Sequence, residues 1–265
     1  VKVDDIIFKN PSITSTRDKN IPFQHGLEKW MPTKFISTIK QPFHIDSIFV
    51  KQGTITVNEI SNITGREATI PLTGVDATLA NITNMPAAND SLHLKANGRL
   101  LDFYIRDMRY TESYSDSLSG FRMIAKMSPI DLTSLTKITN PSAGVDITRG
   151  QADTLYESAA GNKYGAFGEM KFYYHGLRIL ILDTKDTTKK DLILTLKNIV
   201  ADKIIVRNNN KKRSTIFFIR DTEKFIFNYW VKITFSGVLT STRIKSSRKY
   251  HRQYLSFKKQ HLMPD

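Results

Sequence analysis

The sequence of 265 residues contains no cysteine and no run of 18 or more apolar residues. Without cysteine the chain can form neither disulfides nor thiolate metal sites. That absence suits an oxidising compartment, although many cytosolic proteins also lack cysteine. The lack of a long apolar run means that the sequence predicts no transmembrane helix. The first ten residues include Lys2, Asp4, Asp5 and Lys9 and do not resemble a signal peptide.

The common catalytic and metal-binding motifs are missing too. The six histidines, at positions 25, 44, 93, 175, 251 and 261, form no pair at the spacing of metal ligands. The glycine-rich residues 161–168 lack the Lys-Ser/Thr pair of a phosphate-binding loop. Ser119 and Ser236 have glycine on one side only, whereas a nucleophile elbow has it on both. We therefore predict that the protein is not an enzyme and uses no metal or cofactor.

The residues that are abundant, Ile, Thr, Phe and Tyr, favour β-strands. Alternation of apolar and polar residues predicts strands over residues 1–10, 69–82, 92–105, 121–127, 167–174, 177–182 and 215–219. Short helices are expected over residues 32–40 and 129–138, loops over 11–26 and 208–213, and a polar turn over 185–190. Periodicity leaves residues 192–205 and 224–239 open between helix and strand. Residues 246–259 read as a basic tail.

Two similar stretches lie about a hundred residues apart, at residues 43–59 and 143–157. Each has a glycine, Gly53 or Gly150, between two alternating runs, which predicts a β-hairpin. We interpret them as two rounds of a repeating β-unit. The predicted fold is mainly β, a repetitive antiparallel curved sheet that forms an open groove with a few short helices. The predicted divisions are residues 1–31, 32–140, 141–245 and 246–265. The alternative is an ordinary β-sandwich with a chance likeness between two hairpins.

Positive charge is concentrated at the C-terminal end. Residues 203–265 hold 15 Lys and Arg against 3 Asp and Glu, so most of the net charge of +14 lies there. Such a segment is either a solvated tail or a contact for an anionic partner, such as a membrane, lipopolysaccharide or nucleic acid. No nucleic-acid recognition module accompanies it, so nucleic acid ranks last. The predicted contacts are Lys211, Lys212, Arg213, Arg248, Lys249, Arg252, Lys258 and Lys259.

Three consecutive segments, IDSIFVKQGTITVNE, GREATIPLTGVDATLANITN and LHLKANGRLLD, resemble the AsmA-like and TamB-like group of bacterial envelope proteins. The resemblance covers roughly residues 30–240 and rests on spacing and strand order. It implies a long curved sheet with an apolar inner surface, held in the periplasm by a transmembrane helix upstream of this chain. It further implies a role in outer-membrane biogenesis and phospholipid movement. The partners would be phospholipid or another anionic envelope lipid, and other envelope proteins.

A curved sheet of alternating strands can turn one apolar face toward an acyl chain and one polar face toward water. The side chains that we expect to line such a groove are Ile55, Val57, Leu79, Leu94, Phe103, Met123, Phe172 and Ile179. The alternative for each is packing against the protein's own helices. A structural or adhesion-type β-sandwich with a basic tail that binds an anionic partner is the second functional hypothesis.

Overall fold

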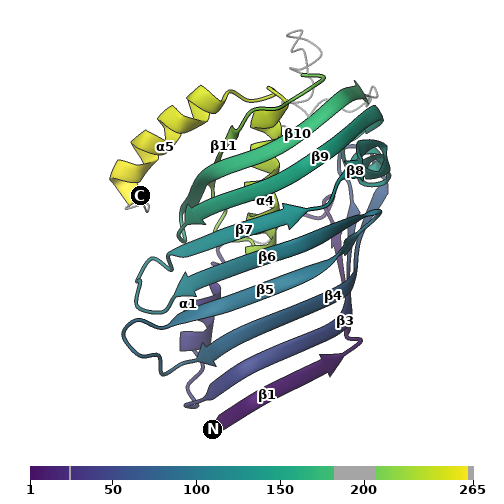
Figure 1. Ribbon diagram of the computed structural model, residues 1–265. Helices are drawn as coiled ribbons and strands as arrows, with labels where there is room; N and C mark the ends of the chain where they lie inside the picture. The colour runs from purple at the N-terminus through teal and green to yellow at the C-terminus, as the bar shows by residue number, and fades with distance from the viewer. Residues whose placement is uncertain (24, 182–206, 262–265) are drawn as a thin grey trace.

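A computed structural model describes residues 1–23, 25–181 and 207–261 of the chain, and its strands form one open, curved sheet (Figure 1). The sheet order is β1-β3-β4-β5-β6-β7-β9-β10-β11, with β2 beside β3 and β8 beside β9. The strands are β1 (Lys2–Lys9), β2 (Ser12–Asp18), β3 (His44–Ile60), β4 (Glu67–Thr83), β5 (Ser91–Leu100), β6 (Phe103–Ser113), β7 (Phe121–Met127), β8 (Ile130–Asp131), β9 (Val145–Gly161), β10 (Gly165–Ile181) and β11 (Ser214–Ile219). Of the described strands, only β1 and β2 pair in parallel, both with β3. The predicted mainly β, mostly antiparallel open sheet is thus confirmed, and the described strands do not divide into the two packed sheets of a sandwich.

A row of bulges bends the sheet. The β3–β4 ladder shifts register on both sides of Gly53, and the next ladders shift between Thr73 and Asp76, between Ala96 and Gly98, and between Ile105 and Asp107. These irregularities lie opposite one another in successive strands, so they cross the sheet as a line. A bulge bends its strand and increases the local twist. The aligned bulges therefore fold the far ends of β3–β6 toward the inner face.

Both predicted hairpins are wrong, because each is one continuous strand of 17 residues, β3 or β9. Gln52 beside Gly53 has a left-handed backbone (φ 55°), which marks a bulge in an unbroken strand. Gly150 has a φ of 148°, and a Cβ there would lie 3.2 Å from Leu132 Cδ1. Glycine between two alternating runs is compatible with either a hairpin or a bulge, and only the partner strand distinguishes them. The repeating feature is therefore a pair of long strands, β3–β4 and β9–β10.

Other predicted boundaries change as well. Residues 12–18 of the predicted loop form β2, and residues 92–105 divide into two strands at Leu101, whose φ is 51°. The strand expected at residues 167–174 and the described residues of that expected at 177–182 form one strand, β10, which passes through a bulge at Gly176. The basic tail, for which no conformation was predicted, forms helix α5 (Ser247–His261). Residues 185–190 and 192–205 lie outside the described residues.

In the part of the chain that the structure describes, four α-helices and one short 3-10 helix accompany the strands. The expected helix at residues 32–40 is α1 (Pro32–Ser37), and that at 129–138 is the 3-10 helix η1 (Leu132–Leu135) followed by α2 (Thr136–Ala143). Residues 224–239, left open by periodicity, largely form α4 (Ile226–Ser241). Ser61 and Arg66 in the β3–β4 turn donate hydrogen bonds to the carbonyls of Ser142 and Asn140 (2.6 and 2.9 Å), so α2 holds the far end of the bent strands.

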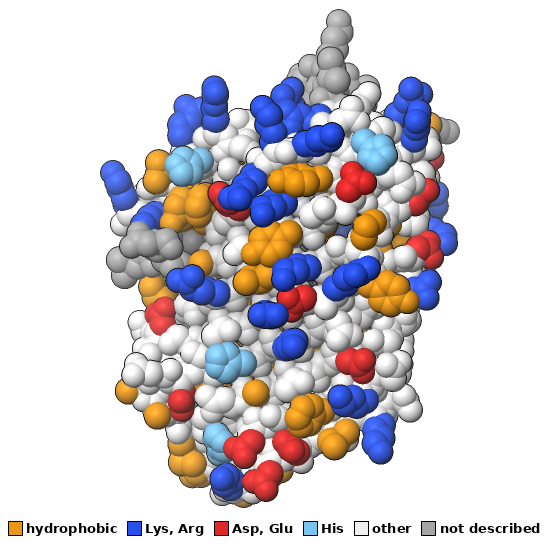
Figure 2. Space-filling view, in the orientation of Figure 1, with side chains coloured by type: hydrophobic (Ala, Val, Ile, Leu, Met, Phe, Trp, Pro, Cys, Tyr) orange, Lys and Arg blue, Asp and Glu red, His pale blue; other side chains and the backbone are white. Residues whose placement is uncertain are grey.

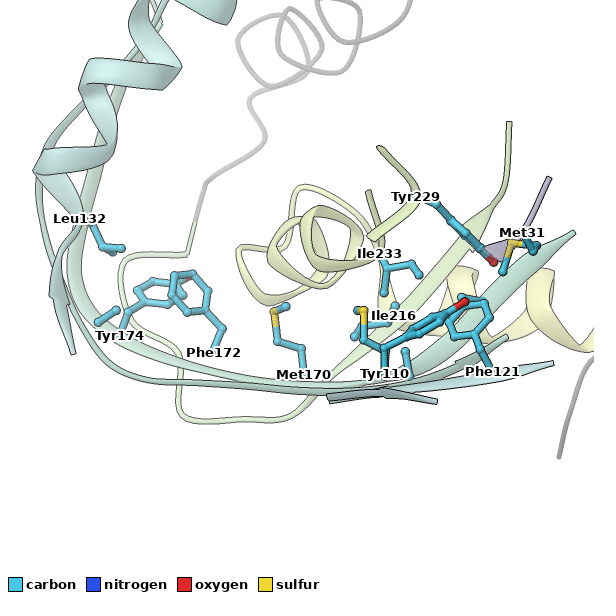
Figure 3. Close-up of a cluster of buried hydrophobic side chains, with 14 of the residues drawn as sticks. Met31, Tyr110, Phe121, Leu132, Met170, Phe172, Tyr174, Ile216, Tyr229 and Ile233 are labelled. Atoms are coloured by element: carbon cyan, nitrogen blue, oxygen red, sulfur yellow. The ribbon is translucent and has the colours of Figure 1, made fainter. Parts of the chain in front are cut away.

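Helix α4 lies across the inner face of the sheet and forms the main core with β9, β10 and β11 (Figures 1 and 3). Its buried residues include Tyr229, Ile233, Gly237 and Thr240, which recur every three or four positions and so share one side of the helix. A Cβ at Gly237 would lie 2.8 Å from Met170 Sδ, so glycine permits the close approach of helix and sheet. Helix α5 covers the opposite, outer face at β11, and both sides of that strand are therefore covered.

Candidate functional site

All eight predicted groove residues lie on the inner face of the sheet. Leu79 pairs directly with Leu94, Leu94 with Tyr110, and Tyr110 with Met123. Residues opposite each other in a ladder point to the same face, so this row is continuous across four strands. The remaining ladders place the other members on the same side: Ile55, Val57, Phe103, Phe172 and Ile179. The predicted common apolar face is present.

The eight residues differ in what covers them. Phe103, Met123 and Phe172 are buried, and the last two belong to the main core beneath α4 (Figure 3). Leu79 packs in the smaller cluster around Ile36 of α1. Leu94 and Ile179 pack against the main core. For Leu79, Leu94, Met123, Phe172 and Ile179, packing within the protein's own core clusters describes the structure better than an open groove.

Ile55 and Val57 are different, because they are half-buried and belong to none of the three core clusters that the described residues form, whereas Phe103, also outside the clusters, is buried. They lie beyond the bulge, where the strands bend inward. Their ladder partners share the same face: Ile55 pairs with Leu72 and with Ile13, and Val57 pairs with Ile70. We call the five side chains Ile13, Ile55, Val57, Ile70 and Leu72 the bent wall. Ile13 is 61% exposed and the other four are half-buried.

Charged residues mark one end of the bent wall. Glu59, two residues beyond Val57 on the same face, forms an ion pair with Lys19. Lys232 of α4 lies near this ion pair. Burial, followed by repulsion from Lys19 and Lys224, lowers the pKa of the Lys232 ammonium group. The apolar strip therefore ends at a polar boundary between β2, β3 and α4.

Two carboxyl groups are buried within the inner face. Glu157 of β9 is 1% exposed and accepts a hydrogen bond from Thr234 of α4 (2.7 Å), while its Oε2 has no partner. Burial raises the pKa of Glu157 to about 7. Glu112 of β6 is fully buried and accepts hydrogen bonds from Tyr110 Oη (2.6 Å) and from the backbone N–H of Thr33 (3.0 Å), and burial raises its pKa as well. Neither glutamate is among the predicted site residues. The available signal for Glu157 was its place in a row of apolar inward residues of β9.

The predicted anionic-surface residues fall into two groups, one in the loop before β11 and one along α5, whose last turns reach Gly165 beside the other end of β11. Lys211, Lys212 and Arg213 are exposed in the loop before β11, where Arg213 lies 3.1 Å from Glu169 Oε2. The backbone N–H of Thr215 donates to Ser247 Oγ (3.3 Å), so the start of α5 lies beside this loop. On α5 itself, Lys258 is half-buried and four cations are exposed: Arg248, Lys249, Arg252 and Lys259.

Helix α5 is attached to the sheet by its aromatic side. Tyr254 stacks on Phe167 with ring centroids 3.7 Å apart, and Phe217 contacts Tyr250, Tyr254 and Phe257 edge-on. The cations therefore project away from a fixed aromatic contact. Figure 2 shows further Lys and Arg side chains, with hydrophobic groups among them, over the outer face of the sheet. The sequence predicted the charge of this segment but not its helical form.

No protein-family model, curated protein or solved structure matches the chain. Within residues 1–23, 25–181 and 207–261, His, Asp and Glu side chains form no cluster of three that could hold a metal ion. Among the same residues, no helix has the length and apolar character needed to cross a membrane. The features that the geometry offers for function are therefore the apolar inner face, its buried polar groups and the basic helix α5.

Proposed function

We propose that this protein is a non-enzymatic lipid-binding module that holds an acyl chain against the bent wall and contacts an anionic membrane surface through α5. The observation that carries the proposal is the set of apolar side chains on the inner face beyond the bulges that no core cluster includes. Each methylene that such a surface removes from water contributes about 0.8 kcal/mol. Binding along this strip needs no special chemistry, only an apolar face of sufficient length.

The proposal limits lipid contact to a few of the eight predicted groove residues. Met123, at 1% exposed, and Phe172, at 5%, support the wall from within the core and do not contact lipid. Ile55 and Val57 are the contact residues, together with their neighbours in the bent wall. A role as lipid conduit or scaffold in outer-membrane biogenesis, and a periplasmic location with a membrane anchor upstream, rest on the sequence resemblance to AsmA-like proteins.

The two faces of β3 provide a matched test of acyl-chain binding. Ile55→Glu with Val57→Glu places two carboxylates on the inner face, whereas Thr54→Glu with Thr56→Glu places the same charge on the outer face of the same strand. We expect the inner pair to weaken binding of a fluorescent fatty acid by at least about 100-fold, because burying an unpaired charge costs several kcal/mol. The outer pair should bind like the unmodified protein. Equal affinity in both variants would place the ligand elsewhere.

Helix α5 should determine binding to anionic membranes. In a vesicle-sedimentation assay with phosphatidylglycerol, we expect Arg248→Glu, Lys249→Glu and Arg252→Glu together to reduce binding by about 100-fold or more, since each cation near such a surface contributes about 1 kcal/mol. The control makes the same charge change at the exposed residues Lys95, Arg106 and Arg122 of β5–β7. A smaller loss in the control supports a specific role of α5. An equal loss would show attraction by net charge alone.

A further inference from the structure

Strand β1 forms one border of the sheet. Among the described strands it pairs only with β3, and in Figure 1 its other side faces away from α4 and α5. Over residues 5–9, which we call the β1 edge, the register with β3 is continuous, so this part of the strand is regular. A border strand presents unpaired N–H and C=O groups, and it is therefore a template for pairing with another strand.

One printed contact shows which backbone groups of the β1 edge face outward. The N–H of Asn10 donates to the carbonyl of Lys51 on β3 (2.8 Å). Successive N–H groups of a regular strand point to opposite sides, so those of the even-numbered residues of the edge also point toward β3. The residues that turn their N–H groups away from the sheet are Asp5, Ile7 and Lys9.

The side chains of the β1 edge divide between the two faces of the sheet. Ile6 lies on the inner face, because its partner Ile48 pairs in turn with Leu79. Side chains alternate along a strand, so Phe8 shares the inner face and the odd-numbered residues lie on the outer one. Ile7 is 57% exposed and Phe8 is 49% exposed. Both faces of the edge therefore offer apolar surface to a neighbouring strand.

The outer face of the β1 edge also carries charge of both signs. Lys9 has Lys51 as its partner in the β1–β3 register, so two cations are adjacent on this face and repel each other. Neither Lys9 nor Asp5 forms an ion pair with any residue that the structure describes. A strand that placed a carboxylate beside Lys9 and a cation beside Asp5 would complement this border.

We propose that the β1 edge pairs in antiparallel fashion with the β1 edge of a second copy of this chain, about a two-fold axis at Ile7. In this register Asp5 of each copy lies opposite Lys9 of the other, which gives two ion pairs on the outer face. Ile7 lies opposite its own counterpart, and Ile6 lies opposite Phe8 on the inner face. The pairing goes beyond the proposed function, because it requires neither a lipid nor α5.

The other two-fold registers complement the edge less well. An axis at Asp5 would place two carboxylates opposite each other, and like charges in that position are destabilising. An axis at Ile6 would place Asp5 opposite Ile7, and an axis at Phe8 would place Lys9 opposite Ile7. A shift by a single residue would set inner side chains against outer ones, which a continuous sheet does not allow.

The paired segment is short, because the chain bends where β1 ends. Asn10 has a left-handed backbone (φ 51°) and is followed by Pro11. A ladder limited to the β1 edge buries less surface than a permanent dimer needs, so the association is expected to be reversible and dependent on concentration.

The test is sedimentation velocity of the full, lipid-free chain over a range of concentrations, at low ionic strength where surface charges are least screened. We expect a monomer–dimer equilibrium. Asp5→Lys and Lys9→Asp, each alone, should weaken dimerisation by about tenfold or more, because each converts both opposite-charge pairs into like-charge pairs. An equimolar mixture of the two variants should recover the dimer, since one copy then presents only cations and the other only carboxylates. Native mass spectrometry identifies the mixed dimer by its mass.

The controls make the same changes of charge at exposed residues away from the β1 edge, with Asp102→Lys in the β5–β6 turn and Lys95→Asp on β5. Both should dimerise like the unmodified protein. If circular dichroism shows that a charge variant does not fold, Ile7→Pro carries the test. It removes an outward N–H without breaking a hydrogen bond to β3, so it should abolish the dimer.

The outcomes separate this pairing from other uses of the border strand. Recovery of the dimer in the mixture of Asp5→Lys and Lys9→Asp supports the proposed register. A monomer at every concentration overturns the proposal and leaves the edge to a strand of different sequence. A dimer that neither charge variant weakens, or one that the mixture does not restore, places the interface elsewhere and overturns it equally.

Discussion

Replacement of Ile233 by alanine is expected to lower the free energy of unfolding by about 2–5 kcal/mol, the usual cost of deleting a large aliphatic side chain from a packed core. Ile233 has no exposed surface and lies at the centre of the contact between α4 and the sheet (Figure 3). The cavity left behind could not be filled easily, because Met170 and Ile216 on the strands below are themselves fully packed. Urea unfolding followed by circular dichroism measures the change.

The matched control is Val231→Ala on the same helix. Val231 is 64% exposed, so its truncation should change the free energy of unfolding by no more than about 0.5 kcal/mol. A large effect at position 233 with a small one at 231 means that α4 is packed on the inner face as described. Small effects at both positions would show that α4 is not packed there, and the inner face would then be open along its whole length.

The stability of the protein should fall between about pH 4.5 and pH 7 because of Glu157. Burial raises the pKa of this carboxyl from 4.5 to about 7 in the folded protein. Below pH 4.5 the group is protonated in both states, and its contribution to stability is fully present. Between the two pKa values the unfolded chain loses the proton while the folded chain retains it, so stability declines as pH rises through 7. The expected total is roughly 3 kcal/mol, at 1.36 kcal/mol for each pKa unit.

Glu157→Gln removes the titrating group while keeping the size of the side chain. Urea unfolding at several pH values should therefore show a flatter dependence in this variant than in the unmodified protein, by roughly 3 kcal/mol over that range. Glu169→Gln on the neighbouring strand is the control, since Glu169 is exposed and forms a surface ion pair with Arg213. Parallel pH profiles for the unmodified protein and Glu157→Gln would mean that Glu157 is not buried in solution.

Strand alternation was sufficient to predict the apolar face. Because side chains in a strand alternate with a period of two, residues as distant as Ile55 and Ile179 were placed on one face before any pairing was known. The edges of β7 were also predicted correctly, at Phe121 and Met127. Alternation does not show which strands pair or in what register. The bulges at Gly53 and Gly150 depend on that pairing, so they could not be predicted.

Burial was harder to predict than strand identity. Helix α4 is apolar on nearly all sides, so its sequence does not show which side meets the sheet or even whether it is a helix. Helix α4 covers Met123 and Phe172, so the burial of these two side chains could not be predicted without knowing where the helix lies. One cavity is lined by residues as distant as Glu28 and Arg220, which are about 190 positions apart in the sequence. No local pattern connects them.

Native mass spectrometry of the purified chain, with extraction and identification of any bound lipid, tests the central claim most directly. We predict protein masses increased by one lipid, loss of that increment in Ile55→Glu/Val57→Glu, and its retention in Thr54→Glu/Thr56→Glu. Lipid-free masses for the unmodified protein, together with amide exchange that shows the bent wall excluding water without a ligand, would contradict the claim that this face binds acyl chains.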